Sequence, residues 1–209
     1  MSRGIFRRLR NPALDTAIRL GLVPYRQPFP ADTTQWDKDY STDELDFYAA
    51  FRERARYAVL LGYLNAREAG LSILDVGCGV GLMRDRIPDH LVGRFCGCDP
   101  SAVAIQEAQD RAWLNSEFHV EAMPSAALGE FDVIICNEML YYVDDVDALL
   151  VRLASMLKPG GWLLSSVTRH PGDSVLHEKL DRHFLRIDAV TVKSEVAALK
   201  WRLACHAKR

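Results

Sequence analysis

The sequence lacks any apolar run close to the roughly eighteen residues that a membrane-spanning helix needs. It has no internal repeat and no low-complexity tract, and its net charge of −2 gives no global attraction to nucleic acid. The 209 residues are 49% hydrophobic and 26% charged, which is typical of a globular domain with a full core. We therefore expect a cytoplasmic protein without a nucleic-acid partner.

The sequence has few cysteines, and their number is odd: Cys78, Cys96, Cys98, Cys136 and Cys205. Most lie in apolar, strand-like runs, so we expect buried reduced thiols rather than disulfides. Cys96 and Cys98 share one strand face, but no second Cys/His pair lies nearby, so this spacing is a weak metal signal. His177 and Asp181, one helical turn apart, are interpreted as a solvated helix face. We predict no metal site.

The N-terminal region is rich in arginine. Residues 1 to 26 hold six arginines and one acid, with apolar residues between them. This pattern fits a segment that contacts an anionic membrane or a protein partner, a transit peptide, or an arm packed on the domain. Residues 21 to 35 contain three prolines and indicate an extended linker. We predict an arm and linker over 1–35 and a domain over 36–209, with a helical cover over 36–70.

The rest of the chain alternates between strand and helix patterns. One helix is predicted over Thr42 to Ala69. Strands are predicted at Ser72–Val76, Arg94–Cys98, Glu117–Val120, Phe131–Cys136 and Trp162–Val167. Helices are predicted near Leu82–Ile87, Ser101–Leu114, Val146–Leu157 and Ser174–His183, and a final hairpin pairs Phe184–Val192 with Ala198–His206. Such alternation predicts an α/β fold, a doubly wound parallel sheet ending in an antiparallel hairpin.

The strongest local signal is "ILDVGCGVG", Ile73 to Gly81. Its glycines, where a strand gives way to a helix, let the backbone turn tightly and approach a ligand. The spacing is G-x-G-x-G, whereas a dinucleotide fingerprint needs G-x-G-x-x-G. Asp99 ends the next strand, and the ends of these two strands are adjacent in this topology. Asp99 is therefore placed to bind two ribose hydroxyls above the glycine turn.

Four motifs together carry a family resemblance. The segments "ILDVGCGVG", "GCDPSAVAI", "FDVIICNEMLYYVDD" and "LKPGGWLLSS", over about residues 70 to 168, resemble class I S-adenosylmethionine-dependent methyltransferases in order and spacing. The resemblance implies a seven-strand Rossmann-like sheet with an antiparallel last strand, and S-adenosyl-L-methionine as cofactor. The Glu and paired tyrosines after the fourth strand are most similar to small-molecule and saccharide enzymes, nearest the nodulation-factor N-methyltransferases.

The resemblance also implies a cofactor site. Asp75 would orient the methionine ammonium, Asp99 would bind the ribose, and Asn137 would offer its backbone carbonyl. The full set comprises Asp75, Gly77, Cys78, Gly79, Gly81, Asp99, Pro100, Glu121, Ala122, Met123 and Asn137. One alternative remains open: if the Met123-Pro124 pair is held in register with the family, His119 takes the acidic position instead of Glu121.

The acceptor side is less determined by the sequence. Glu138 follows the fourth strand and is either a general base or a structural group that bonds backbone amides or an arginine. His170, just past the fifth strand, is the rival base. Possible acceptor contacts are aromatic or basic: Trp36, Tyr40, Arg54, Tyr57, Tyr141 and Tyr142.

The sequence thus favours methyl transfer to a hydroxyl or amine of a small molecule, with a saccharide or glycan intermediate as the expected acceptor. The basic arm would then hold the protein near a membrane. Two alternatives stay open: a protein or RNA methyltransferase docked through the arm, and a non-catalytic partner subunit. The second is disfavoured because the glycine turn and the ribose acid are intact.

Overall fold

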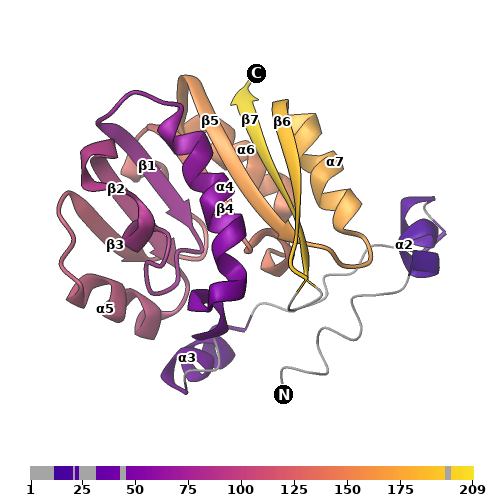
Figure 1. Ribbon diagram of the computed structural model, residues 1–209, viewed down its shortest axis with the longest axis horizontal. Coiled ribbons are helices and arrows are strands. Elements are labelled where there is room, and N and C mark those ends of the chain that lie inside the picture. Colours follow the sequence, from indigo (N-terminus) through magenta and orange to yellow (C-terminus); the bar gives the residue numbers. More distant parts are fainter. Residues whose placement is uncertain (1–11, 21, 24–31, 43–45, 196–198) are drawn as a thin grey trace.

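A seven-stranded sheet forms the centre of the molecule. The computed structural model describes residues 12–20, 22–23, 32–42, 46–195 and 199–209 (Figure 1). The sheet order is β3-β2-β1-β4-β5-β7-β6. The strands are β1 Leu71–Val76, β2 Val92–Asp99, β3 Ser116–Val120, β4 Phe131–Asn137, β5 Leu157–Thr168, β6 Phe184–Lys193 and β7 Lys200–Lys208. This is the predicted α/β class.

The direction of the strands confirms the predicted topology. Neighbouring strands from β1 to β5 are parallel, and β7 runs antiparallel to both β5 and β6. The last strand of the sequence lies inside the sheet and β6 lies at its edge. Strand β1 lies between β2 and β4, so the carboxyl ends of these three strands meet where the order reverses. Open α/β sheets bind ligands at that switch point.

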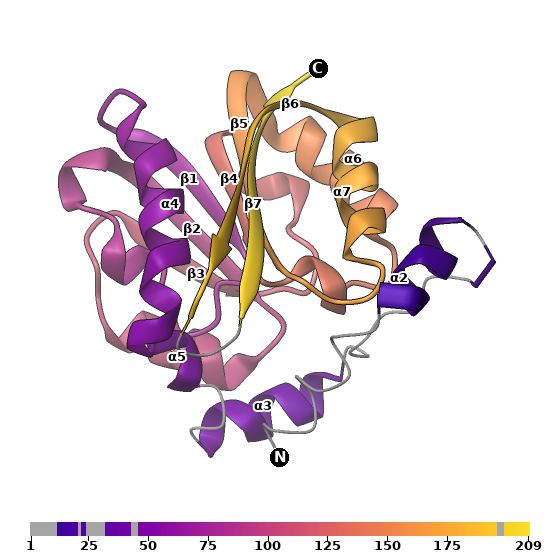
Figure 2. The ribbon, with the colours of Figure 1, turned by 45° about the vertical axis from the view of Figure 1, so that its right-hand side comes forward.

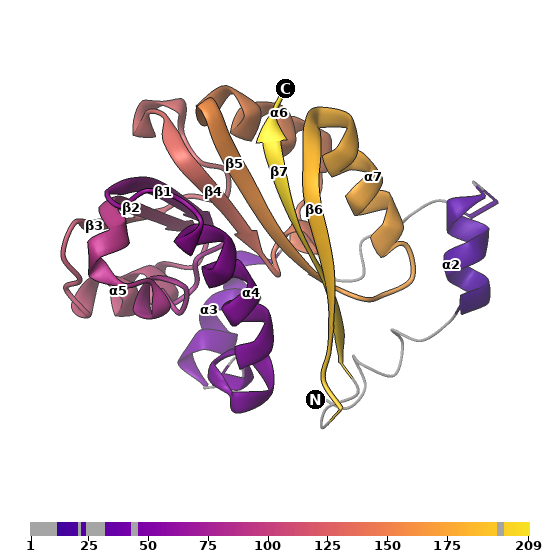
Figure 3. The same cartoon turned by 45° about the horizontal axis from the view of Figure 1, so that its top comes forward.

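Helices cover both faces of the sheet, as the doubly wound prediction requires. Helices α6 and α7 lie on one face of the sheet, and α4 and α5 lie on the other (Figures 2 and 3). Buried leucines of α6 and α7 belong to one core cluster, whereas Leu60 and Leu64 of α4 and Ile105 of α5 belong to the other. The α-helices are α2 Pro12–Arg19, α3 Thr33–Ser41, α4 Arg54–Asn65, α5 Ala102–Asp110, α6 Val146–Met156 and α7 Asp173–His183. Asp145 caps α6 by accepting from the amide of Ala148.

Two predicted helices differ from the structure, although part of the first is present as α4. The helix expected over residues 42–69 is broken into two 3-10 turns, Asp46–Ala49 and Phe51–Glu53, followed by α4. Ala50 is extended, with φ −62° and ψ 154°, and this bend lets Tyr48 face the guanidinium of Arg56. The helix expected near residues 82–87 is only a 3-10 turn, Arg84–Arg86, because the buried Arg84 side chain bonds surrounding carbonyls instead of solvent.

The start of the fifth strand also differs from the prediction. Its bounds include Pro159, which was expected to lie in the turn before the strand. The pairing jumps from Leu157 opposite Phe131 to Trp162 opposite Val133. The additional residues between these pairs are accommodated as an irregularity in the ladder, so strand pairing begins before the proline and resumes after it.

Only part of the predicted N-terminal arm and linker lies within the described residues. Residues 1–11 and 24–31, which hold most of the basic arm and the linker prolines, lie outside the described residues. Helix α3 begins at Thr33, inside the expected linker, and Asp37 on it accepts from Ser101 Oγ at 2.6 Å. No described helix is long and apolar enough to cross a membrane. The boundary at residue 35 and the role of the arm stay predictions.

Candidate active site

A cavity of about 510 Å³ opens at the carboxyl ends of β1, β2 and β4. The glycine turn and the two strand-end acids form one part of its wall, and residues from α3 and α4 form another. Most of the predicted site residues line it: Trp36, Tyr40, Tyr57, Asp75, Gly77, Cys78, Gly79, Asp99, Pro100, Ala122, Met123, Asn137, Glu138 and Tyr142. The topology therefore brings together residues that are more than one hundred positions apart.

The glycine turn has no room for side chains. Gly77 and Gly79 have φ of +69° and +52°, a region that favours glycine. A Cβ on Gly77 would lie 2.7 Å from Met139 Cβ, and one on Gly79 would lie 2.6 Å from Tyr40 Oη. The backbone is held in this turn by the amides of Gly77 and Cys78, which both donate to the carbonyl of Cys98. The turn is thus a fixed backbone wall.

Gly81 plays a different part from the one predicted. It also has a positive φ, of +79°, but a Cβ there would lie 2.6 Å from the ring of Trp113. Gly81 is buried and does not line the cavity. Its prediction as a cofactor contact is corrected: the residue lacks a side chain because Trp113 packs against it.

Two buried acids lie at the strand ends beside the turn. Asp99 accepts from the amides of Gly79 and Ser101, both at 2.9 Å. Asp75 is 2% exposed, and its Oδ1 has no hydrogen-bond partner among the described residues. Burial, together with the charge of Asp99, raises the pKa of Asp75 to about 8. A buried acceptor of this kind fits a cationic partner, such as the ammonium of S-adenosylmethionine.

The residues predicted to contact adenine divide into two groups. Pro100, Ala122 and Met123 line the cavity. Glu121 does not, because its carboxylate accepts from the amide of Ser125 at 2.7 Å and so holds the following turn. The alternative, His119, faces Glu117 instead of the cavity. Neither candidate for the acidic adenine contact lines the cavity, whereas the apolar residues predicted beside them do.

Glu138 lines the cavity directly after the end of β4. It is 6% exposed and has φ of +60°, an uncommon backbone conformation for a residue with a side chain. Its carboxylate accepts from Ser166 Oγ at 2.7 Å, from Tyr141 Oη at 3.0 Å and from Thr168 Oγ1. Its hydrogen-bond partners are thus hydroxyls rather than the amides or arginine of the structural interpretation. These bonds fix the position of the carboxylate.

Two predicted residues lie behind Glu138 instead of in the cavity. Tyr141 is buried and supports the carboxylate, and its ring centroid lies 5.6 Å from that of His170. The Nδ1 atom of His170 lies 3.0 Å from the carbonyl of Pro171. Neither side chain lines the cavity, so His170 is corrected as a base and Tyr141 as an acceptor contact.

Aromatic rings form much of the acceptor side. Trp36 and Tyr142 contact each other edge to face, with centroids 4.6 Å apart. Arg54, predicted here, is exposed, does not line the cavity and lies over the ring of Phe51. Rings that meet at right angles leave flat faces against which a planar or cyclic ligand can pack.

Arg56 and Tyr48 are site residues that sequence reasoning missed. Arg56 is 0% exposed, donates to Glu53 Oε2 at 2.9 Å and bonds the Oδ1 atom of Asn137. Its guanidinium lies 5.6 Å from the ring centroid of Tyr48 and 4.3 Å from that of Tyr57. A signal was present in the sequence. Arg56 stands four residues before Leu60 and eight before Leu64, on the apolar face of its helix.

The sheet order, the glycine turn and the strand-end acids define a class I S-adenosylmethionine-dependent methyltransferase fold with a fitting cofactor site. A family model described as "Methyltransferase domain" matches residues 44–208, and the chain belongs to this family.

Two sequence relatives are both ubiquinone biosynthesis O-methyltransferases. The protein from Albidiferax ferrireducens is 36% identical over 116 residues, covering 52% of this chain and 46% of that protein. The protein from Xanthomonas axonopodis pv. citri is 32% identical over 162 residues, covering 68% and 67%. The chain thus matches about half the length of the first relative.

Solved structures share the fold. The N-methyltransferase NodS from Bradyrhizobium japonicum WM9, in complex with S-adenosyl-l-homocysteine, has a TM-score of 0.71 at 20% identity, covering 84% of this chain and 97% of that one. The magnesium protoporphyrin IX methyltransferase ChlM from Synechocystis PCC 6803, with bound SAM, has a TM-score of 0.66 at 19% identity, covering 86% and 98%.

Proposed function

We propose that this chain transfers the methyl group of S-adenosylmethionine to a hydroxyl or amine of a small molecule, and that the acceptor is a saccharide or glycan intermediate. The observation that carries the proposal is the single cavity that joins a glycine turn and two strand-end acids to Glu138 and a set of aromatic rings. The O-methyltransferase relatives support a hydroxyl acceptor, and the structural similarity to the N-methyltransferase NodS supports an amine as the alternative.

In this proposal, some residues of the cavity bind the cofactor and another removes the proton of the acceptor. Asp75 would pair with the ammonium of the cofactor, and Asp99 would accept from its ribose hydroxyls. The bound cofactor supplies an activated methyl group on a sulfonium, so the protein must chiefly place the acceptor in line with it. Glu138 is the group at the acceptor wall that can take the acceptor proton, because its hydroxyl partners hold the carboxylate in place.

The charges around the cavity bear on the acceptor class. Two basic residues line the cavity, Arg56 and Arg111, and Arg56 already pairs with Glu53. The acidic lining residues are more numerous: Asp75, Asp99, Glu107, Glu138, Asp144 and Asp145. This balance disfavours an anionic acceptor. Sugars and phenols both fit an acidic, aromatic cavity, since each has an uncharged hydroxyl and a face that packs on aromatic side chains.

A phenolic acceptor is the second candidate. It is supported by the similarity to ubiquinone biosynthesis O-methyltransferases, and it suits the same rings of Trp36 and Tyr142.

Two measurements test the proposal. Calorimetric titration with S-adenosylhomocysteine should show one-to-one binding that Asp99→Ala weakens at least tenfold. Methyl transfer from labelled S-adenosylmethionine should then be measured on neutral saccharides, amino sugars and catechols at matched concentration. Labelling of a saccharide supports the saccharide acceptor. Labelling of catechols alone supports the phenolic acceptor instead. Absence of cofactor binding at millimolar concentration would overturn both.

A further inference from the structure

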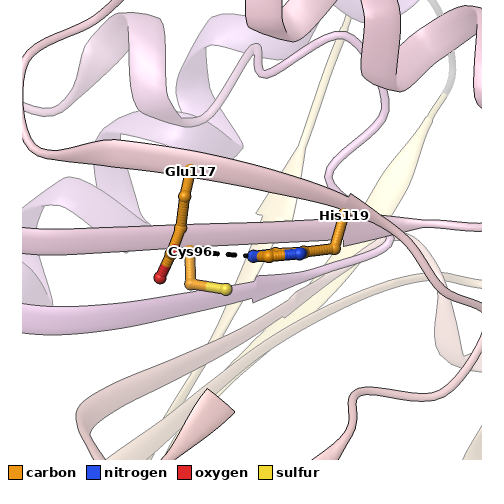
Figure 4. A group of neighbouring side chains, drawn as sticks. All are labelled: Cys96, Glu117 and His119. Atoms are coloured by element: carbon orange, nitrogen blue, oxygen red, sulfur yellow. Dashed lines mark ion pairs between the residues drawn. The ribbon is translucent and has the colours of Figure 1, made fainter. Parts of the chain in front are cut away.

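A group of three metal-ligating side chains lies outside the cavity, on the β2–β3 edge of the sheet. Cys96 on β2 pairs in register with Glu117 on β3, and Cys98 pairs with His119. Because side chains alternate along a strand, Cys96, Glu117 and His119 all point to the same face. Figure 4 shows Glu117 and His119 projecting from one strand and Cys96 from its neighbour, toward a common space.

The ligand atoms of these residues converge. One atom of each, the thiol sulfur, a carboxylate oxygen and an imidazole nitrogen, lies within 4.8 Å of the other two. Ligand atoms of a tetrahedral zinc ion are roughly 3.3–3.8 Å apart. Small side-chain rotations therefore suffice to reach the geometry of a bound ion.

Two ligand atoms of this group, His119 Nε2 and Glu117 Oε2, are oriented toward each other without a hydrogen bond between them. The Nε2 atom of His119 is shielded from solvent and has no hydrogen-bond partner among the described residues, since the nearest oxygen of Glu117 is 3.6 Å away. Arg94 holds the other oxygen, Oε1, through its Nε at 2.9 Å. This contact orients the carboxylate and leaves Oε2 facing His119, as hydrogen bonds to ligating carboxylates commonly do.

We propose that Cys96, Glu117 and His119 bind one zinc ion that links β2 to the edge strand β3, with water as the fourth ligand. A thiolate and an imidazole select zinc over magnesium or calcium, which prefer oxygen alone. Binding forms the sulfur–zinc bond and releases the thiol proton to solvent. The side chains of His119 and Glu117 are 34% and 44% exposed, so the ion and its water can enter from solvent.

The site would stabilise the cavity from a distance. Strand β3 is the sheet edge and has 5 residues, and the chain that follows it supplies Ala122 and Met123 to the cavity wall. An ion between β2 and β3 would fasten this strand to the strand that ends in Asp99. We therefore expect zinc to raise thermal stability without taking part in methyl transfer.

The test is a titration of the metal-free full-length chain with zinc against a chromogenic chelator. One equivalent should bind, and His119→Gln and Cys96→Ser should each weaken binding at least tenfold. Matched controls, His90→Gln at an exposed histidine and Cys205→Ser at another buried thiol, should bind as the wild type does. Cobalt should give a sulfur-to-metal charge-transfer band that is absent in Cys96→Ser.

Folding of the variants is followed by thermal melting. Zinc should raise the melting temperature of the wild type but not that of His119→Gln. Because His119 is partly exposed, that variant keeps the test valid even where Cys96→Ser does not fold. Binding of less than one equivalent, or affinity unchanged in His119→Gln, would overturn the proposal. Since none of these readouts measures methyl transfer, the outcome is independent of the proposed function.

Discussion

Glu138 combines a backbone conformation of positive φ with a carboxylate held by neighbouring hydroxyls. Such conformations persist where the surrounding structure enforces them, and they cluster at functional sites. From the sequence alone, both proton removal and a structural role were open for this residue, and the structural role was favoured. Its contacts now place an oriented carboxylate at the cavity wall, and a substitution can separate the two roles.

We predict that Glu138→Gln lowers kcat at least tenfold while the affinity for S-adenosylhomocysteine changes less than threefold. The amide keeps the shape of the side chain but cannot accept the acceptor proton. Steady-state kinetics and calorimetry measure the two effects. Ser166→Ala, which removes a single supporting donor, should cost less than Glu138→Gln. A loss of cofactor affinity or of folding in Glu138→Gln would show that the residue is structural.

Gly79 allows a second prediction at this scale. Gly79→Ala places a methyl group against Tyr40 Oη at a φ of +52°, so we expect cofactor affinity to fall at least tenfold. Tyr40→Phe removes the oxygen that is hit, and the double variant should recover part of the lost affinity in the same calorimetric titration. No recovery would show that the φ requirement, rather than the contact with Tyr40, dominates.

At the scale of elements, helix α4 is joined to strand β4 by a buried arginine. Arg56 bonds Asn137 at the end of β4 and pairs with Glu53, which is itself 2% exposed. The sequence placed this arginine correctly on the helix but gave no partner for it, because Asn137 is 81 residues away. Its apolar spacing with Leu60 indicated burial, whereas the partner depends on how the helix docks.

We predict that Arg56→Met lowers the free energy of unfolding by about 3–5 kcal/mol, since it leaves the buried Glu53 carboxylate with only the partly exposed Arg52, whose Nε lies 3.4 Å from Glu53 Oε1. Urea denaturation measures this loss. Adding Glu53→Gln to Arg56→Met should restore part of the stability. The exposed neighbour Arg54, changed in the same way, should cost less than about 0.5 kcal/mol. Equal losses at Arg54 and Arg56 would contradict the interpretation of α4 docking.

At the scale of the whole molecule, the buried acid Asp75 links stability to pH. Burial raises its folded pKa from 3.8 to about 8. Between these values the folded state holds a proton that the unfolded state has lost, so stability falls as pH rises. The contribution of Asp75 is fully present below pH 3.8 and is lost as pH approaches about 8.

We predict that Asp75→Asn flattens the fall in stability between pH 5 and pH 8. The removed slope is at most about 1.4 kcal/mol per pH unit, the effect of one proton. Chemical denaturation at several pH values measures the slope. Asp110→Asn, at an exposed acid on α5, should leave the slope as it is. A slope that is unchanged in Asp75→Asn would show that Asp75 is already ionised in the fold.

The sequence by itself determined the class of fold, the glycine turn and the strand-end acids. These depend on local spacing and on the parallel topology, both of which can be read along the chain. Only the tertiary structure decided that His170 and Tyr141 lie behind Glu138, that Gly81 packs on Trp113, and that Arg56 reaches the site. Strand register likewise set Cys96 beside Glu117 and His119. Such pairings join distant positions, and packing selects them through shape and burial.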